Sequence, residues 1–117
     1  MRRMIPILGL ALVLRMDGVQ VDRVLMSVSY YTSLDGVYPT DITASGAPVG
    51  PGVAACGPSY DFGLTILLDC GIMVTCQDRG IEIGDGNLDI WLPVDADGTD
   101  TTAHMMGRHN EWAWVIQ

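Results

Sequence analysis

The sequence predicts a small, mainly β protein, a closed six-stranded β-barrel with one short helix. Short apolar runs rich in Val, Ile, Thr and Tyr recur along the chain, separated by Gly, Pro and Asp turn signals. Hydrophobic residues make up 49% of the 117 positions, which is enough for one packed core but, at this length, not for two. No internal repeat or heptad pattern is present. A single closed sheet of short strands therefore fits the pattern.

The first barrel strand is expected over residues 24–31, where Val24, Met26 and Val28 alternate with outward-facing neighbours. Apolar runs bounded by turn residues predict further strands at 53–56, 64–68, 72–76, 88–92 and 111–116.

A short helix is expected over 102–106, capped by Thr101 and ended by Gly107. In the last strand Trp112 and Trp114 share one face. We interpret that face as core or as a subunit contact.

Residues 1–23 are expected to form an N-terminal apolar segment ahead of a barrel domain over 24–117. Two arginines precede an apolar run over 4–14, as at the start of a signal peptide. The run is short for a bilayer span, and no small-x-small cleavage site follows. A signal-like role, an anchor and a segment packed on a partner (a second copy or a particle component) stay open, as does a translation start at Met16.

The charge pattern excludes one class of partner. The formal net charge is −8 and the chain has no lysine, so the sequence predicts no nucleic-acid-binding surface, which needs clustered Lys and Arg. An acidic face suits a neutral or partly basic glycan, and it equally serves solubility. We expect no cofactor and no metal.

The three cysteines, Cys56, Cys70 and Cys76, are an odd set without a CxxC pair, so a zinc ribbon is excluded. One disulfide with one free thiol fits an extracytoplasmic protein, and three reduced thiols fit a cytosolic one. The count leaves both open.

Two carboxylates are the main candidates for chemistry. Asp78 ends one predicted strand, and Asp89 lies within the next. Paired carboxylates on adjacent strands are what acid/base chemistry on sugars needs. With Leu88 and Ile90 on the core face, Asp89 and Trp91 share the other face, where the indole can stack on a sugar ring. The alternatives are a solvent-facing acid beside an exposed Trp, and a turn-stabilising role for Asp78.

Six segments, in this order and spacing, carry a resemblance to a known family. They are Val28-Ser29-Tyr30-Tyr31-Thr32, Thr43-Ala44-Ser45-Gly46-Ala47-Pro48-Val49 with Pro51-Gly52-Val53-Ala54, Phe62-Gly63-Leu64-Thr65-Ile66, Asp78-Arg79-Gly80, Asn87-Leu88-Asp89-Ile90-Trp91 and Ala103-His104-Met105-Met106-Gly107-Arg108. Through them the chain resembles the three-aspartate (3D) domain family of bacterial cell-wall proteins. That family is related to the barrel of membrane-bound lytic transglycosylase A and to rare-lipoprotein-A-like and expansin-like double-psi β-barrels.

The resemblance implies a double-psi β-barrel that acts on the glycan strands of peptidoglycan. Asp89 would protonate the glycosidic oxygen and then act as base on the sugar's 6-hydroxyl, giving an anhydro-sugar, while Asp78 would stabilise the cationic transition state. The surroundings of Asp89 would have to raise its pKa. It also implies a substrate-binding set: Trp91, Arg79, His104 and Arg108.

The chain departs from the family at two positions. The first of the three defining aspartates falls on Cys56, and the second glycine after the central aspartate is Ile81. A disulfide between Cys56 and Cys76 could replace what that aspartate organises. Cys70 with Cys76 is a second candidate pair.

Two further site hypotheses stand beside the paired acids. One is a Cys56 nucleophile with His104 or His109. The other concerns Asp95, Asp97 and Asp100, which hint at calcium but lack the spacing of an EF-hand, so a solvated loop is favoured.

The sequence leaves two functions from different classes. One is a peptidoglycan-cleaving domain like a lytic transglycosylase. The other is a non-catalytic structural or glycan-binding barrel, for example in a phage-type particle. Both place the protein outside the cytoplasm or on a virion.

Overall fold

The computed structural model describes residues 10–16, 18–35 and 41–117. In these residues the chain forms seven strands and one short helix. They are β1 (Leu10–Met16), β2 (Val19–Tyr31), β3 (Val53–Cys56), β4 (Thr65–Leu68), β5 (Met73–Asp78), β6 (Asn87–Trp91), α1 (Thr101–Met106) and β7 (His109–Ile116).

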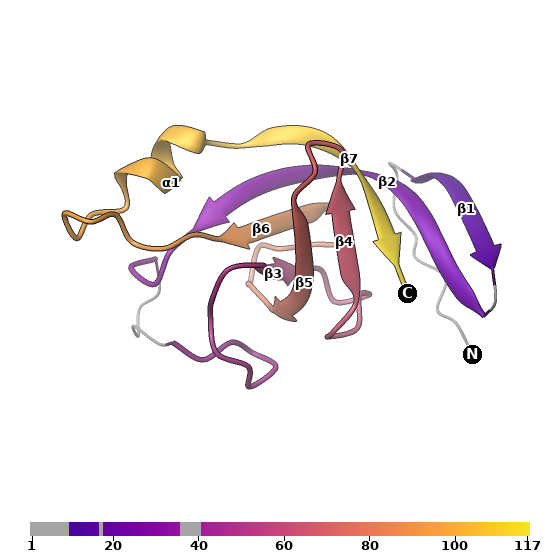
Figure 1. The fold of residues 1–117 in the computed structure, drawn as a ribbon, viewed down its shortest axis with the longest axis horizontal. Coiled ribbons are helices and arrows are strands. Elements are labelled where there is room, and N and C mark those ends of the chain that lie inside the picture. Colours follow the sequence, from indigo (N-terminus) through magenta and orange to yellow (C-terminus); the bar gives the residue numbers. More distant parts are fainter. Residues whose placement is uncertain (1–9, 17, 36–40) are drawn as a thin grey trace.

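Six of these strands close a barrel (Figure 1). The hydrogen-bonded order is β1-β2-β6-β3-β5-β4-β7, and β7 pairs back onto β2. The pairs β2–β6 and β3–β5 are parallel, while the other ladders are antiparallel. The prediction of a mainly β, six-stranded barrel with one short helix is confirmed, and the mixed parallel pairs are consistent with a double-psi barrel.

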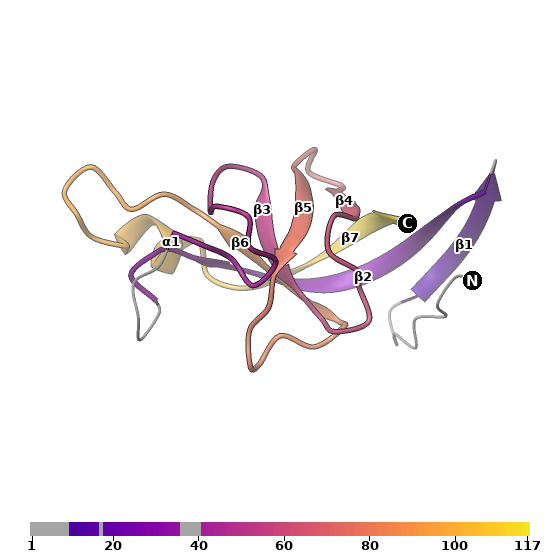
Figure 2. The ribbon, with the colours of Figure 1, turned by 90° about the horizontal axis from the view of Figure 1, so that it is seen from below.

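The long strand β2 joins the barrel to β1. A turn at Gly18, whose φ of 79° favours glycine, connects β1 to β2 in an antiparallel hairpin. Figures 1 and 2 both show this hairpin reaching beyond the barrel, at the end opposite α1. β2 begins at Val19, so its first five residues lie within the N-terminal segment predicted over residues 1–23. The first part of the predicted apolar run, up to residue 9, lies outside the described residues.

No helix among the described residues is long and apolar enough to cross a membrane.

The barrel interior is filled by alternate residues of every barrel strand, as period-2 side-chain alternation requires. On β6, Leu88 is fully buried and Ile90 is 4% exposed, which confirms the predicted core face of that strand. Tyr60, from the β3–β4 connection, is fully buried in the same cluster.

The last strand presents its tryptophans outward. Ala113 and Val115 point into the core, and the half-buried Trp112 and Trp114 lie on the outer face. The guanidinium of Arg23 stacks over both indoles, 5.6 Å and 4.7 Å from the ring centroids. The interpretation of the Trp112/Trp114 face as core is wrong, because the residues between and after the two tryptophans, Ala113 and Val115, are the ones that point inward.

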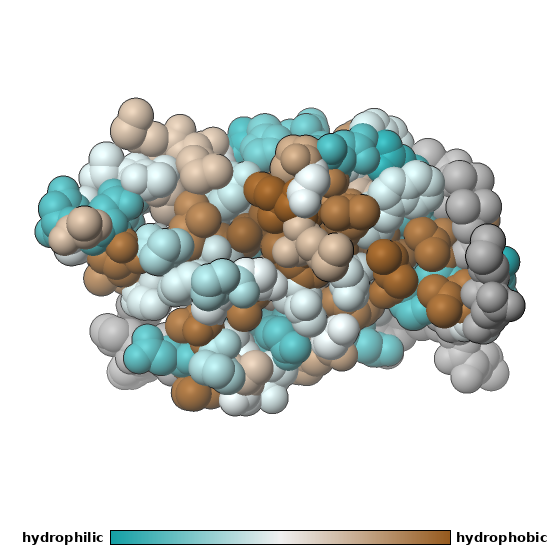
Figure 3. All heavy atoms as spheres, viewed as in Figure 1, coloured by the Kyte–Doolittle hydropathy of each residue, from teal (hydrophilic) through white to brown (hydrophobic). Residues whose placement is uncertain are grey.

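The turn between β4 and β5 exposes apolar surface. Ile72 is 40% and Met73 is 61% exposed. Figure 3 shows hydrophobic residues gathered over this part of the barrel, while hydrophilic residues dominate the neighbouring edge.

The helix α1 begins one residue earlier than expected. Asp100, not Thr101, is its N-cap residue, and Gly107 ends it with a φ of 61°. Ala103 is the buried residue of this helix.

A disulfide joins Cys56 at the end of β3 to Cys76 on β5, with Cα atoms 5.8 Å apart. These strands are parallel neighbours, and Ala54 pairs with Cys76. The first of the two candidate pairings is therefore correct. Cys70 is a free, exposed thiol.

The disulfide closes a 20-residue separation, so its removal should relax the unfolded chain. We expect the double variant Cys56→Ala, Cys76→Ala to lower the free energy of unfolding by about 2–4 kcal/mol in a urea titration. Cys70→Ala is the matched control and should leave the midpoint unchanged. Equal midpoints for all three proteins would show that the disulfide contributes nothing.

Candidate functional site

One cross-strand row of the barrel carries both candidate acids. Ser29 on β2 pairs with Asp89 on β6, Asp89 pairs with Ala55 on β3, and Ala55 pairs with Asp78 on β5. The register therefore places Ser29, Asp89, Ala55 and Asp78 side by side on four neighbouring strands. The sequence predicted that both acids lie at one site, and the sheet pairing supplies the residue between them.

A register shift in β5 places Asp78 in this row. Ala54 pairs with Cys76, but Ala55 pairs with Asp78, so Gln77 is the extra residue of a bulge. In a regular strand Asp78 would share the core face of Cys76, because residues two apart point the same way. The bulge re-aims the carboxylate toward the outer face, which is a common use of bulges beside functional sites.

The two acids are separated by one strand. Two interstrand spacings of roughly 4.8 Å place their Cα atoms about 10 Å apart. Ala55 between them has the smallest side chain that keeps a Cβ, so the floor between the acids stays open. A groove with a volume of about 440 Å³ lies over this row and is lined by Ala55, Asp78 and Asp89.

Aromatic and aliphatic side chains form the groove walls. Tyr31 and Trp91 are directly paired on β2 and β6, two residues beyond Ser29 and Asp89 on the same face. Both line the groove. The indole Nε1 of Trp91 is buried and has no acceptor among the described residues, so the groove meets the ring rather than its N–H. The other walls are aliphatic: Ile42, Val49, Ile81 and Ile83.

Asp89 is a half-buried acid with one hydrogen bond. The Ser29 hydroxyl donates to its Oδ1 at 2.9 Å, and no other described residue bonds to it. Burial raises the pKa of Asp89 above its ordinary value, and the nearby charges of Asp35 and Asp78 raise it further. The Ser29 hydrogen bond and the charge of Arg108 oppose this shift without cancelling it. A carboxyl with a raised pKa is the property that a general acid needs.

Asp78 is held by its neighbours. Its Oδ2 accepts a hydrogen bond from the Tyr31 hydroxyl at 2.9 Å. Its Oδ1 accepts from the backbone N–H groups of Ala44 at 3.0 Å and Arg79 at 2.9 Å. This carboxylate fixes Tyr31 and the 41–49 segment at the rim of the groove. Burial first, and then the bond to Asp78, raise the pKa of Tyr31, so the phenol stays protonated and donates.

Arg79 lines the groove but is anchored in place. Its guanidinium donates to the carbonyl of Tyr60 and to the sulfur of Cys76, and it stacks over Phe62 with 4.1 Å to the ring centroid. No carboxylate pairs with it among the described residues. A fixed positive charge therefore faces the groove beside Asp78.

The structure places His104 and Arg108 outside the groove lining. His104 lies on α1, is 74% exposed at its side chain and pairs with Asp100. Arg108 follows the helix and is exposed. Its charge lowers the pKa of Asp89, so it acts on the site through space. The predicted substrate set is thus brought together only in part: Trp91 and Arg79 are in the groove, and the other two lie at its α1 end.

The structure also bears on the two alternative site hypotheses, the Cys56 nucleophile and the acidic loop over 95–100. A Cys56 nucleophile is wrong, because that sulfur is buried in a disulfide. In the 95–100 loop, Asp97 Oδ1 accepts from the N–H and hydroxyl of Thr99, and Asp95 accepts from the N–H of Thr102. Two of the three loop acids therefore hold the loop itself.

Sequence reasoning missed three residues of the site. Ala55 is found only through the register, and Ser29 only through the parallel pairing of β2 with β6. Tyr31 lay within a family-like segment but was not assigned a role. The sequence did contain a signal for Tyr31. It follows Ser29 by two residues, so both side chains lie on the same face of β2.

Comparisons with known proteins agree with this fold. No protein-family model matches the chain, and no curated protein matches it. Among solved structures, a variant of the E. coli lytic transglycosylase MltA in an apo form is similar, with a TM-score of 0.53 and 17% identity. The match covers 70% of this chain and 29% of that chain, so this protein corresponds to less than a third of that structure. At this identity, the likeness shows a shared barrel fold.

Asparagine substitutions at the two acids should change the stability of the folded protein in opposite directions. Asp78→Asn keeps only one acceptor oxygen for three donors, so we expect a loss of about 1–3 kcal/mol in the free energy of unfolding at pH 7. Asp89→Asn removes a half-buried charge, so we expect a higher melting temperature at pH 7.

The pH dependence of that gain follows from the sign of the Asp89 shift. A folded-state pKa above the unfolded value of about 3.9 means that stability falls as pH rises through the folded pKa. The advantage of Asp89→Asn should therefore be present at neutral pH and vanish below about pH 4. Melting curves of both variants from pH 3 to 7 check this, and a stabilised Asp78→Asn would contradict the assignment.

Proposed function

We propose that this domain cleaves the glycan strands of peptidoglycan in the manner of a lytic transglycosylase, with Asp89 as its acid and base. The observation that carries the proposal is the half-buried Asp89 in an open groove, with a raised pKa and one carboxylate oxygen without a partner among the described residues. The barrel shared with a lytic transglycosylase supports it.

The reaction needs one carboxyl group acting twice. Protonated Asp89 donates its proton to the glycosidic oxygen as the bond from C1 to that oxygen breaks. The 6-hydroxyl of the same sugar then forms a bond to C1, and the Asp89 carboxylate takes the proton from that hydroxyl. The products are a 1,6-anhydro-sugar end and a free hydroxyl on the leaving strand, no water is consumed, and Asp89 is again protonated.

The hydrogen bonds that engage Asp78 favour this single-acid scheme. A retaining glycosidase with a carboxylate nucleophile needs its two carboxyl groups about 5–5.5 Å apart. Asp78 lies one strand beyond Ala55, and its oxygens already accept three hydrogen bonds. We therefore assign Asp78 to positioning Tyr31, with its negative charge stabilising the cationic transition state from the groove edge.

The groove chemistry suits a sugar. Trp91 and Tyr31 offer ring faces for the apolar side of a pyranose, and Asp89 and Arg79 add polar groups to the same lining. Arg79 supplies a fixed cation for the acidic substituents of peptidoglycan in a protein of net charge −8.

A second function has its own supporting observation. Asp78 is fully engaged by neighbours, and a disulfide replaces the first of the three acids of the resembling family. A barrel that binds glycan without cleaving it, or that serves as a structural module in a phage-type particle, fits these facts. The partner in both cases would be peptidoglycan or a particle component.

An extracytoplasmic or virion-associated location follows from the same proposal. A disulfide between two fully buried sulfurs persists in oxidising compartments, and the fold is shared with a lytic transglycosylase.

Digestion of purified peptidoglycan decides between the two functions. We expect the wild type to release anhydro-muropeptides, detected by mass spectrometry, and Asp89→Asn to lower the rate by at least about 10²-fold because it removes the acid and the base together. Asp69→Asn, which removes a charge from the turn after β4, is the matched control and should keep the rate. Folded wild type that releases nothing would leave the binding module as the function.

Trp91 should contribute to glycan binding under both functions. We expect Trp91→Ala to weaken cosedimentation with insoluble peptidoglycan by about tenfold, corresponding to roughly 1–1.5 kcal/mol for a lost aromatic contact. Trp114→Ala truncates an outward-facing indole and should bind like the wild type. If the two variants bind equally, the groove is not the glycan site.

A further inference from the structure

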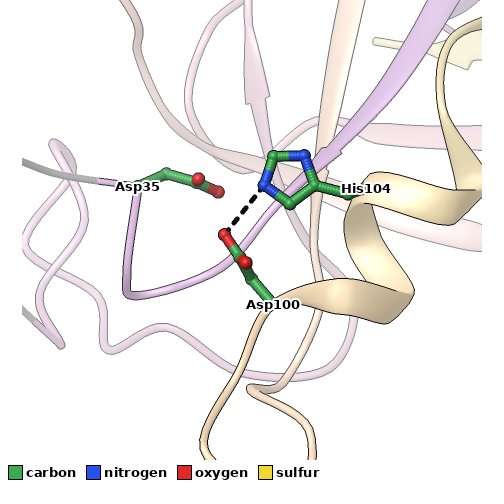
Figure 4. Close-up of side chains that lie close together, drawn as sticks. All are labelled: Asp35, Asp100 and His104. Atoms are coloured by element: carbon green, nitrogen blue, oxygen red, sulfur yellow. Dashed lines mark hydrogen bonds and ion pairs between the residues drawn. The ribbon is translucent and has the colours of Figure 1, made fainter.

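A cluster of metal-ligating side chains lies at the α1 end of the groove. Asp35 follows β2, Asp100 is the N-cap residue of α1, and His104 lies one turn further along that helix. Figure 4 shows the carboxylate of Asp35 directed toward the space between the imidazole and the carboxylate of Asp100. The three groups come from two segments separated by 65 positions, so the fold rather than local sequence brings them together.

The geometry is close to that of a bound ion. One ligating atom from each residue lies within 4.8 Å of the other two, and His104 Nε2 is 3.1 Å from Asp100 Oδ2. Bonds of about 2.0–2.2 Å to a tetrahedral zinc ion place neighbouring ligand atoms roughly 3.4 Å apart. The side chains of Asp35 and His104 are exposed, so small rotations of these two side chains would close the remaining gap.

Two negative charges in this cluster lack a permanent counter-charge. Among the ion pairs of the described residues, neither Asp35 nor Asp100 has an arginine partner, and His104 carries charge only when protonated. Among the described residues, the Asp35 side chain accepts one hydrogen bond, from the N–H of Thr32 to Oδ2, at 2.7 Å. Its Oδ1 therefore stays available, and a cation would offset the repulsion between the two carboxylates.

The donor set selects the class of ion. One imidazole nitrogen with two carboxylate oxygens suits zinc and neighbouring transition metals, whereas magnesium and calcium prefer oxygen ligands only. Three protein ligands leave a coordination position for water or a substrate group.

We propose that Asp35, Asp100 and His104 bind one divalent transition-metal ion of the zinc class. The ion ties the segment after β2 to α1. Because Asp35 also lines the groove, the ion lies at the end of the groove. This site does not depend on the glycan-cleaving function, and a failure of one leaves the other standing.

Isothermal titration of the metal-free full-length protein with Zn²⁺ tests the proposal. We expect one ion per chain and a higher melting temperature with excess zinc, because a ligand that binds the folded state stabilises it. His104→Ala should weaken the affinity by more than about tenfold, since even loss of an outer-shell partner can have that effect. Asp35→Asn should also weaken it, which distinguishes three ligands from the His104–Asp100 pair alone.

The other histidine supplies the control. His109 pairs with Glu111 at 3.0 Å, and Glu111 also accepts from the backbone of Cys70, whose thiol is free. His109→Ala and Cys70→Ser should bind zinc as the wild type does. Loss of binding in these two variants, with His104→Ala unaffected, would place zinc at that second cluster and overturn the proposal, as would the absence of any saturable heat. Binding of Mg²⁺ as strong as that of Zn²⁺ would contradict the metal class.

Discussion

The pairing of β2 with both β6 and β7 is the constraint on which the rest of the structure depends. The antiparallel ladder with β7 runs from Val21 to Val28 and closes the barrel, because it brings the last strand back onto the first barrel strand. From Ser27 onward the other edge of β2 pairs with β6 in parallel. That second ladder sets Ser29 beside Asp89 and Tyr31 beside Trp91, so the closure of the fold and the register of the groove are fixed by one strand.

The disulfide and the bulge act together on the other side of the groove. Cys56 and Cys76 join β3 to β5 inside the barrel, where Cys76 directly precedes the bulged Gln77 and Cys56 directly follows Ala55. Ala55, next to Cys56, and Asp78, beyond the bulged Gln77, face outward above this link. Because a covalent bond holds the two strands at that level, the disulfide fixes the spacing of the groove floor.

Local patterns were enough to predict most strands, because alternation and turn residues act within a few positions. The strand over 53–56 was predicted to the residue, and the Leu88–Ile90 core face followed from period two alone. Pairing could not be predicted this way, since the Ala55 register and the bulge at Gln77 depend on strands far apart in sequence. The buried Gln20 and Asp22 were missed for a related reason: their partners are each other and Gln117, at the far end of the chain.

The two acids differ in how many neighbouring groups bond to them and in what surrounds them. Asp78 accepts three hydrogen bonds, and these hold Tyr31 and the rim of the groove in place. Asp89 accepts one hydrogen bond and is half-buried beside other negative charges, which favours the protonated form. A reaction in which one group gives and then regains a proton requires only the second kind of site. Under the proposed reaction, the groove therefore needs one mobile proton and a rigid frame around it, and it does not need a carboxylate at position 56.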